Sequence, residues 1–262
     1  MTRACPSAQR TDPITLRVMK ISPRYDAPPI ISIDGTPGDQ LEPVMRQRRR
    51  LETMLVDLGD DAWRSPSRCE GWSVQDVVAH LVSVDGFWRV SVLAGLGGTP
   101  TRFLDGFDPA ATPALLVEGT RAQAPAEVLD QFVAANRAFL GVLADLDERG
   151  WAAPAESPAG HVPIRLLAHH ALWDCWVHER DIALPLGRIP EVRPDEVRSC
   201  LRYVAALSPA FAISSGGEFA GVFAVDASDP DVRFTLELGE SVSVCDGAAP
   251  PGTPVLCGRA VD

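Results

Sequence analysis

Apolar residues recur at three- and four-residue steps in several long segments of the 262-residue chain. This spacing places them on one face of an α-helix and predicts amphipathic helices. Ser73 and Asp76 form a helix-start signal in which each side chain can satisfy a backbone N–H of the first turn. We therefore expect one helix to begin near Val74. The others are expected over residues 40–58, 125–146, 163–185 and 195–207, with a short one at 114–121.

After residue 208 the pattern changes to short, glycine-punctuated apolar runs of β type at 221–226, 232–238, 241–245 and 255–256. Residues 1–37 show neither helical nor strand periodicity and are interpreted as a disordered lead-in. The sequence thus predicts a mainly α protein with a helical bundle over residues 38–187. A small α+β domain over 188–262 follows it, and the end of the chain soon after the last apolar pair leaves open that its terminal element is missing.

The formal net charge of −11 disfavours binding to nucleic acid or to anionic membranes. The compact basic run, Arg46 and Arg48 to Arg50, is expected mainly on the solvent side of the first helix. The opening residues lack the apolar core of an export signal, and we identify no apolar run of membrane-spanning length. Six scattered cysteines show no disulfide framework. We expect a cytoplasmic protein.

Three of the five histidines lie in the segment LLAHHALWDCWVHERDIALPLG, residues 166–187. His170, Asp174 and His178 follow one another at four-residue steps, so on a helix their side chains share one face. Buried polar groups of this kind are costly without a partner opposite them. Neutral imidazoles and a carboxylate suit a divalent transition metal.

The predicted metal ligands are His80, from the helix that starts near Val74, together with Asp174 and His178. Three ligands on consecutive turns of one helix would span about 12 Å, too far for one ion. His170 is therefore expected to support the site or to lie on the surface, although it could replace His80 as third ligand. Asp181 is expected to orient a ligand histidine, or to pair with Arg180. A metal-free surface pair of Asp174 and His178 is the remaining alternative.

Two segments resemble the signatures of the mycothiol-dependent maleylpyruvate isomerase family, whose metal domain is a DinB-like four-helix bundle. They are RCEGWSVQDVVAHL at residues 68–81 and WDCWVHERDIALPLG at residues 173–187. The resemblance implies that His80 and His178 match the family's first and last metal histidines, with zinc as the usual ion. Asp174 stands where the isomerase has the longer Glu, so it must lie closer to the metal or bind through water.

The resemblance also implies a function. Mycothiol would act as thiol cosubstrate, and a metal-bound thiolate would add to an activated double bond of a small-molecule substrate. The outcome is isomerisation if the thiol leaves and S-transfer if it stays. The family's C-terminal domain is sterol-carrier-like and carries an arginine near its end. Arg259 lies upstream of that place, and no catalytic role is transferred to it.

The leading hypothesis is therefore a zinc-dependent, mycothiol-utilising isomerase or S-transferase that supplies a dry pocket and cationic groups for an acidic substrate. A non-catalytic metal-binding or regulatory module is one alternative. A metal-dependent hydrolase or an iron enzyme on the same bundle is another, since two histidines and one carboxylate also suit Fe(II). The residues do not indicate the substrate or the oligomeric state.

Overall fold

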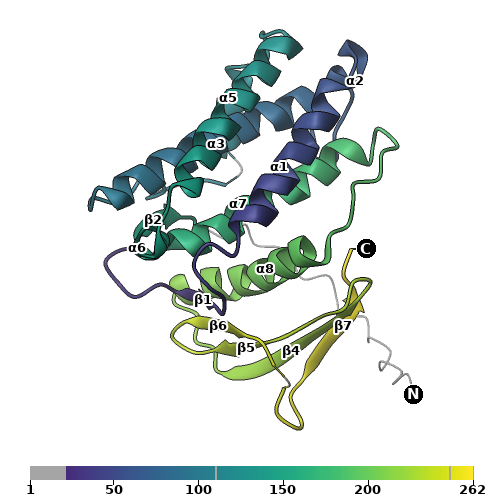
Figure 1. Ribbon diagram of the computed structural model, residues 1–262. Coiled ribbons are helices and arrows are strands. Elements are labelled where there is room, and N and C mark those ends of the chain that lie inside the picture. The colour runs from purple at the N-terminus through teal and green to yellow at the C-terminus, as the bar shows by residue number, and fades with distance from the viewer. Residues whose placement is uncertain (1–21, 110, 248, 262) are drawn as a thin grey trace.

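The computed structural model describes residues 22–109, 111–247 and 249–261, and it consists of a group of helices set above a sheet (Figure 1). The helices are α1 (Leu41–Val56), α2 (Asp60–Arg64), α3 (Val74–Leu96), α4 (Ala111–Glu118), α5 (Pro125–Ala144), α6 (Glu148–Ala152), α7 (Ile164–Ala183) and α8 (Pro194–Ser214). The strands are β1 (Ile31–Ile33), β2 (Pro154–Ser157), β3 (Gly160–Pro163), β4 (Gly221–Ser228), β5 (Val232–Leu238), β6 (Val242–Cys245) and β7 (Val255–Arg259).

The four long predicted helices of the first part are α1, α3, α5 and α7, and they close a ring. Helix α3 packs against α5 and α7, and α1 packs against the same two helices. The predicted start of α3 is confirmed, because Ser73 Oγ accepts a hydrogen bond from the Asp76 amide and Asp76 Oδ2 accepts one from the Ser73 amide. The ring brings His80 on α3 opposite the histidine face of α7.

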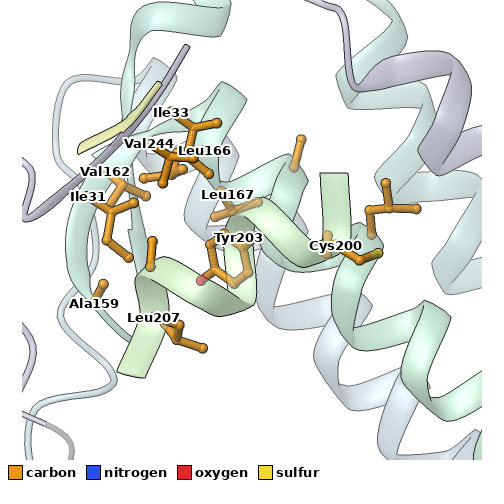
Figure 2. Packing of buried hydrophobic residues seen from close by; sticks show 14 of the residues in the cluster. Ile31, Ile33, Ala159, Val162, Leu166, Leu167, Cys200, Tyr203, Leu207 and Val244 are labelled. Atoms are coloured by element: carbon orange, nitrogen blue, oxygen red, sulfur yellow. The ribbon is translucent and has the colours of Figure 1, made fainter. Parts of the chain in front are cut away.

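Helix α8 lies between the helix ring and a five-stranded sheet of order β1-β6-β5-β4-β7. It packs against α7 on one side and against β1, β5 and β6 on the other (Figure 1). Figure 2 shows Tyr203 and Leu207 of α8 beside Leu167 of α7, with Ile31 of β1 close by. One continuous core cluster therefore contains residues of both predicted domains. The boundary at 187/188 stays a prediction.

The predicted lead-in of residues 1–37 is wrong for the part that the structure describes. Ile31–Ile33 forms β1, which pairs in parallel with β6 of the C-terminal sheet. Ile30, Ile31 and Ile33 are buried, because the strand lies along the sheet edge beneath α8. Residues 1–21 lie outside the described part.

The segment before α7 contains a hairpin. Strands β2 and β3 pair in antiparallel register, with Ser157 opposite Gly160. Glu156 of β2 is fully buried, and its carboxylate accepts hydrogen bonds from Thr101 Oγ1 at 2.6 Å and from the backbone N–H groups of Phe103 and Leu104 at 2.9 and 2.7 Å. The hairpin thereby anchors the long loop that precedes α4.

The expected exposure of the arginines is wrong in part. Arg48 is completely buried, and its Nη1 donates to Asp85 Oδ2 of α3 at 2.6 Å. Arg50 is shielded by Glu179 of α7 and Glu196 of α8. A charged side chain can enter a core when a carboxylate neutralises it, and helical period alone does not reveal that partner.

By length and composition alone, helix α3 could cross a membrane. This corrects the expectation that the chain has no apolar run of membrane-spanning length. Its most apolar 18-residue window has a mean hydropathy of 1.4 and is 44% buried inside the molecule. Core helices of soluble proteins pass the same test, so this property has little weight. Here α3 packs inside the ring and carries His80.

Candidate metal centre and cavity

His80, Asp174 and His178 converge, as the sequence predicts. One ligand-type atom from each side chain lies within 4.8 Å of the others. The rings of His80 and His178 are 5.0 Å apart, and His178 Nε2 is 3.7 Å from Asp174 Oδ1. Two helices that are distant in sequence thus present two imidazoles and one carboxylate to a common point. Asp174 reaches this point despite its short side chain.

Asp181 lies beside His178, the contact that the sequence predicts. Its Oδ2 lies 3.1 Å from His178 Nδ1, one turn further along α7. This contact leaves Nε2 of the same imidazole facing Asp174, the arrangement in which a carboxylate fixes the tautomer of a metal-binding histidine. The alternative partner Arg180 instead stacks its guanidinium over Trp176.

His170 does not join the group. Its Nδ1 lies 2.7 Å from the Tyr203 hydroxyl of α8, and its ring packs between Trp88 and Trp173. Burial lowers the pKa of His170 to about 4, so the imidazole is neutral. It lines the same cavity as the proposed ligands, but its Nδ1 partner is Tyr203 rather than one of them. A direct supporting contact to the metal ligands is therefore not observed for His170 among the described residues.

Cys69 is a member of the site that the sequence analysis missed. Its Sγ donates to Asp181 Oδ2 at 3.3 Å and lies 3.8 Å from His178 Nδ1. Cys69, His178 and Asp181 form a second group with ligand-like spacing. The backbone N–H of the neighbouring Arg68 donates to the Asp181 carbonyl at 3.0 Å, which holds the Cys69 turn against α7.

The electrostatics of the group favour a positive charge. Burial disfavours an imidazolium, but hydrogen bonds to Asp181 and Cys69 and the charge of Asp174 outweigh it and raise the pKa of His178 to about 10. Burial lowers the pKa of His80, and the neighbouring His178 lowers it as well, while the charge of Asp174 partly offsets both. Asp174 Oδ2 is buried without a hydrogen-bond partner among the described residues. An unpartnered carboxylate oxygen beside two imidazoles fits a divalent cation.

The group lies on the wall of a cavity of about 800 Å³. This volume is within the range of small-molecule sites. Helices α3, α4, α7 and α8 and the loop before α4 all contribute to its lining. Trp72, Phe87, Trp88 and Trp173 make the lining strongly aromatic. Helical periodicity does not distinguish a core position from a cavity wall, so the pattern alone does not indicate which aromatic residues line this space.

Residues 44–183 match the family model described as the mycothiol maleylpyruvate isomerase N-terminal domain. The chain belongs to this family. The match spans more than half of the chain and includes all three proposed ligands. The resemblance expected from the two sequence motifs is confirmed.

The chain is also similar to uncharacterized relatives and to solved structures. Two uncharacterized proteins of Mycobacterium tuberculosis, from different strains, are 28% identical over 174 residues, which is 65% of this chain and 63% of theirs. A crystal structure of the mycothiol-dependent maleylpyruvate isomerase matches with a TM-score of 0.56 at 16% identity. A histidine-to-alanine mutant of that enzyme matches with 0.57 at 15%. Each structural match covers 85% of this chain and 84% of the other, and it establishes a shared fold.

The cysteines of this family member lie in different environments. Cys175 and Cys200 are buried and free. Cys69 is half-buried at the candidate metal centre. Cys257 is disulfide-bonded, which the scattered spacing did not indicate. Only long-range packing places a lone cysteine beside its partner.

Proposed function

We propose that this protein is a zinc-dependent, mycothiol-utilising enzyme, acting as an isomerase or S-transferase on a DinB-like helical bundle. His80, Asp174 and His178 would hold the metal. The observation that carries the proposal is the convergence of the two family motifs on an unpartnered carboxylate oxygen at a cavity wall. The family match is the second support.

A divalent cation at this position would stabilise the thiolate form of a thiol, which is the nucleophilic form, at neutral pH. The chain's own residues supply the rest. Asp181 orients His178 through Nδ1. The aromatic cavity walls exclude water from the reacting groups, which strengthens local electrostatics. Three protein ligands leave one side of the site open towards the cavity.

The reaction type depends on how long the thiol stays. A thiol adds across an activated double bond by forming a carbon–sulfur bond while the adjacent carbon takes a proton. If the resulting single bond rotates and the thiol then leaves with loss of that proton, the product is the isomer and the thiol is regenerated. If the thiol stays, the product is an S-conjugate.

Metal analysis of the purified full-length protein tests the metal site. We expect about one zinc per chain in the wild type and at least a tenfold lower content in His80→Ala, because one of three protein ligands is lost. His161→Ala is the matched control, since His161 lies at Thr101 and outside the ligand group. Equal zinc content in the wild type and His80→Ala would refute the proposed ligand set.

Turnover tests the thiol dependence. A panel of activated alkenes with and without mycothiol, assayed with the zinc-loaded protein, should show conversion only when the thiol is present. Activity without added thiol would instead favour a hydrolase on the same metal site. Zinc binding without thiol-dependent conversion of any alkene would favour a non-catalytic metal-binding module.

A further inference from the structure

His170 lines the cavity but is not one of the proposed metal ligands. It precedes Asp174 by one turn of α7, so the two side chains share a face and are about 6 Å apart along the helix axis. Its ring packs between Trp88 and Trp173. His170 therefore lies beside the space that a substrate of the metal centre would occupy.

The contact with Tyr203 determines which ring nitrogen of His170 carries the proton. Tyr203 is 1% exposed, and its hydroxyl lies 2.7 Å from Nδ1. Among the described residues, this hydroxyl has no other hydrogen-bond partner. Because a buried hydroxyl proton needs an acceptor, the phenol donates to Nδ1. Burial raises the pKa of Tyr203, so the phenol keeps that proton. The neutral imidazole then carries its own proton on Nε2.

Nε2–H of His170 is a donor that the protein leaves unused. In the described part of the chain, no hydrogen bond joins this nitrogen to another residue. It is also not among the completely enclosed polar atoms without a partner, whereas Trp88 Nε1 is. His170 as a whole is 6% exposed and lines the cavity. The N–H group is therefore open to an acceptor atom of a bound ligand.

The proposed reaction needs a donor of this kind. When a thiolate forms a carbon–sulfur bond to a double bond conjugated with a carbonyl, the electron pair of the double bond moves towards the carbonyl oxygen. The oxygen carries negative charge until the adjacent carbon takes up a proton. The cationic side chains expected for an acidic substrate are not found here, because no lysine or arginine lines the cavity among the described residues. In the proposed enzyme His178 is a neutral metal ligand, so a neutral donor is left to stabilise this charge.

We propose that His170 is a catalytic residue, in an inference that rests on the proposed function. Its Nε2–H donates to the carbonyl oxygen of the substrate and stabilises the enolate that thiol addition produces. Tyr203 is a positioning residue, because its hydroxyl fixes the tautomer and the ring orientation of His170. Packing between Trp88 and Trp173 orients the donor before the substrate binds, which is the condition under which such a donor stabilises a transition state most.

Two variants at residue 170 separate this role from packing and from metal binding. His170→Phe keeps a planar ring without the donor, while His170→Gln places an amide N–H near the position of Nε2. With zinc, mycothiol and a conjugated ketone, we expect kcat of the full-length protein to fall by about 10²- to 10³-fold in His170→Phe. KM and zinc content should change little, and His170→Gln should recover at least about tenfold in kcat.

His161→Phe is the matched control, because His161 does not line the cavity, and it should leave kcat unchanged. An unchanged kcat in His170→Phe would overturn the proposal. Loss of zinc from His170→Phe would also overturn it, since His170 would then be a metal ligand.

Tyr203→Phe tests the positioning role. Without the phenol, the His170 proton can occupy either nitrogen, so we expect kcat to fall by about tenfold, less than in His170→Phe. Tyr25→Phe is the control, because the Tyr25 hydroxyl donates to Glu156 and Tyr25 does not line the cavity. Equal kcat in the two tyrosine variants would refute the role of Tyr203.

An infrared measurement tests the hydrogen bond without turnover. Benzylideneacetone, a conjugated ketone isotope-labelled at its carbonyl carbon, is bound to the zinc-free full-length protein without thiol. We expect its C=O stretch at lower wavenumber in the wild type and His170→Gln than in His170→Phe, because a hydrogen bond weakens the C=O bond. An equal stretch in all three proteins, or no binding to the wild type, would overturn the proposal.

The two kinds of measurement distinguish the failure of this proposal from the failure of the proposed function. A wild type without thiol-dependent turnover would refute the function, while the infrared shift would still decide whether His170 donates to a bound carbonyl. Thiol-dependent turnover that is the same in His170→Phe would support the function and refute the role of His170.

Discussion

His178 makes two different contacts through its two ring nitrogens. Nδ1 lies 3.1 Å from Asp181, and Nε2 faces Asp174 at 3.7 Å. In the metal-bound form that we propose, the imidazole is neutral, and an Nδ1–H directed at Asp181 leaves Nε2 free to act as the ligand nitrogen. Asp181 therefore influences the metal site without being a proposed ligand.

Asp181→Asn should weaken zinc binding while preserving the shape of the site. The amide oxygen can still accept from Nδ1–H, but the charge that makes the imidazole a better ligand is lost. We expect the zinc Kd to rise by about 10- to 100-fold, measured by competition with a chelator. Asp130→Asn, an exposed change on α5, is the control. The same Kd in both variants would contradict the role of Asp181.

At the scale of elements, α3 is the helix on which the site depends most. It contacts α5, α7, α4 and β2, and it carries both His80 and Trp88. Its contact with β2 is close, because a Cβ at Gly95 would lie 1.7 Å from the Pro154 carbonyl oxygen. The hairpin that anchors the loop before α4 therefore packs directly on the helix that carries a ligand.

Gly95→Ala should destabilise the protein although alanine favours helices. The added methyl would force β2 away from α3, and overpacking of this kind costs about 1–3 kcal/mol. Gly141→Ala on α5 makes the same change where a Cβ meets nothing within 4 Å. It should stabilise the protein by about 0.5–1 kcal/mol. Urea unfolding of both variants would show opposite signs, and destabilisation of similar size in both would refute this packing argument.

At the scale of the whole molecule, buried polar contacts fix α8 to the helix ring. His169 Nδ1 of α7 lies 2.7 Å from Ser199 Oγ of α8, and Ser199 Oγ donates to Gln40 Oε1 at 2.6 Å, just before α1. With the serine proton directed at Gln40, the imidazole donates through Nδ1. Three segments are thus connected around a neutral, buried histidine.

This histidine should make the fold sensitive to acid. Burial, together with the positive charges of Arg202 and Arg165, lowers the pKa of His169 to about 3. Above pH 6.5 the folded and unfolded imidazoles are both neutral. As the pH falls from about 6.5 towards 3, only the unfolded chain takes up the proton, so stability decreases by about 1.4 kcal/mol per pH unit. The effect is largest below the folded pKa.

His169→Asn tests the effect, because the asparagine amide can still donate to Ser199. The free energy of unfolding is measured from pH 4 to pH 7 for the wild type and the variant. We expect the variant to lose less stability on acidification, with a slope lower by about 1.4 kcal/mol per pH unit below pH 6. Parallel curves would show that His169 does not remain neutral in the folded state.

The sequence by itself determined the local features of this protein. The helix starts at Val74 and Pro125, the β-type runs after residue 208 and the pair Asp174 and His178 all follow from periodicity and capping over a few neighbouring residues. The family motifs further identified His80 as the partner of that pair. Such signals can be interpreted without knowledge of the tertiary structure, because the residues that interact are only a few positions apart in the chain.

Tertiary structure alone decided the rest. It placed Cys69 beside His178, buried Arg48 against Asp85, and joined β1 to β6 more than 200 residues later. It also assembled the cavity from four helices and several loops. Each of these depends on a partner that is distant in the chain. The residue types show what a side chain can do, but the cost of burying it is known only once its neighbours are in place.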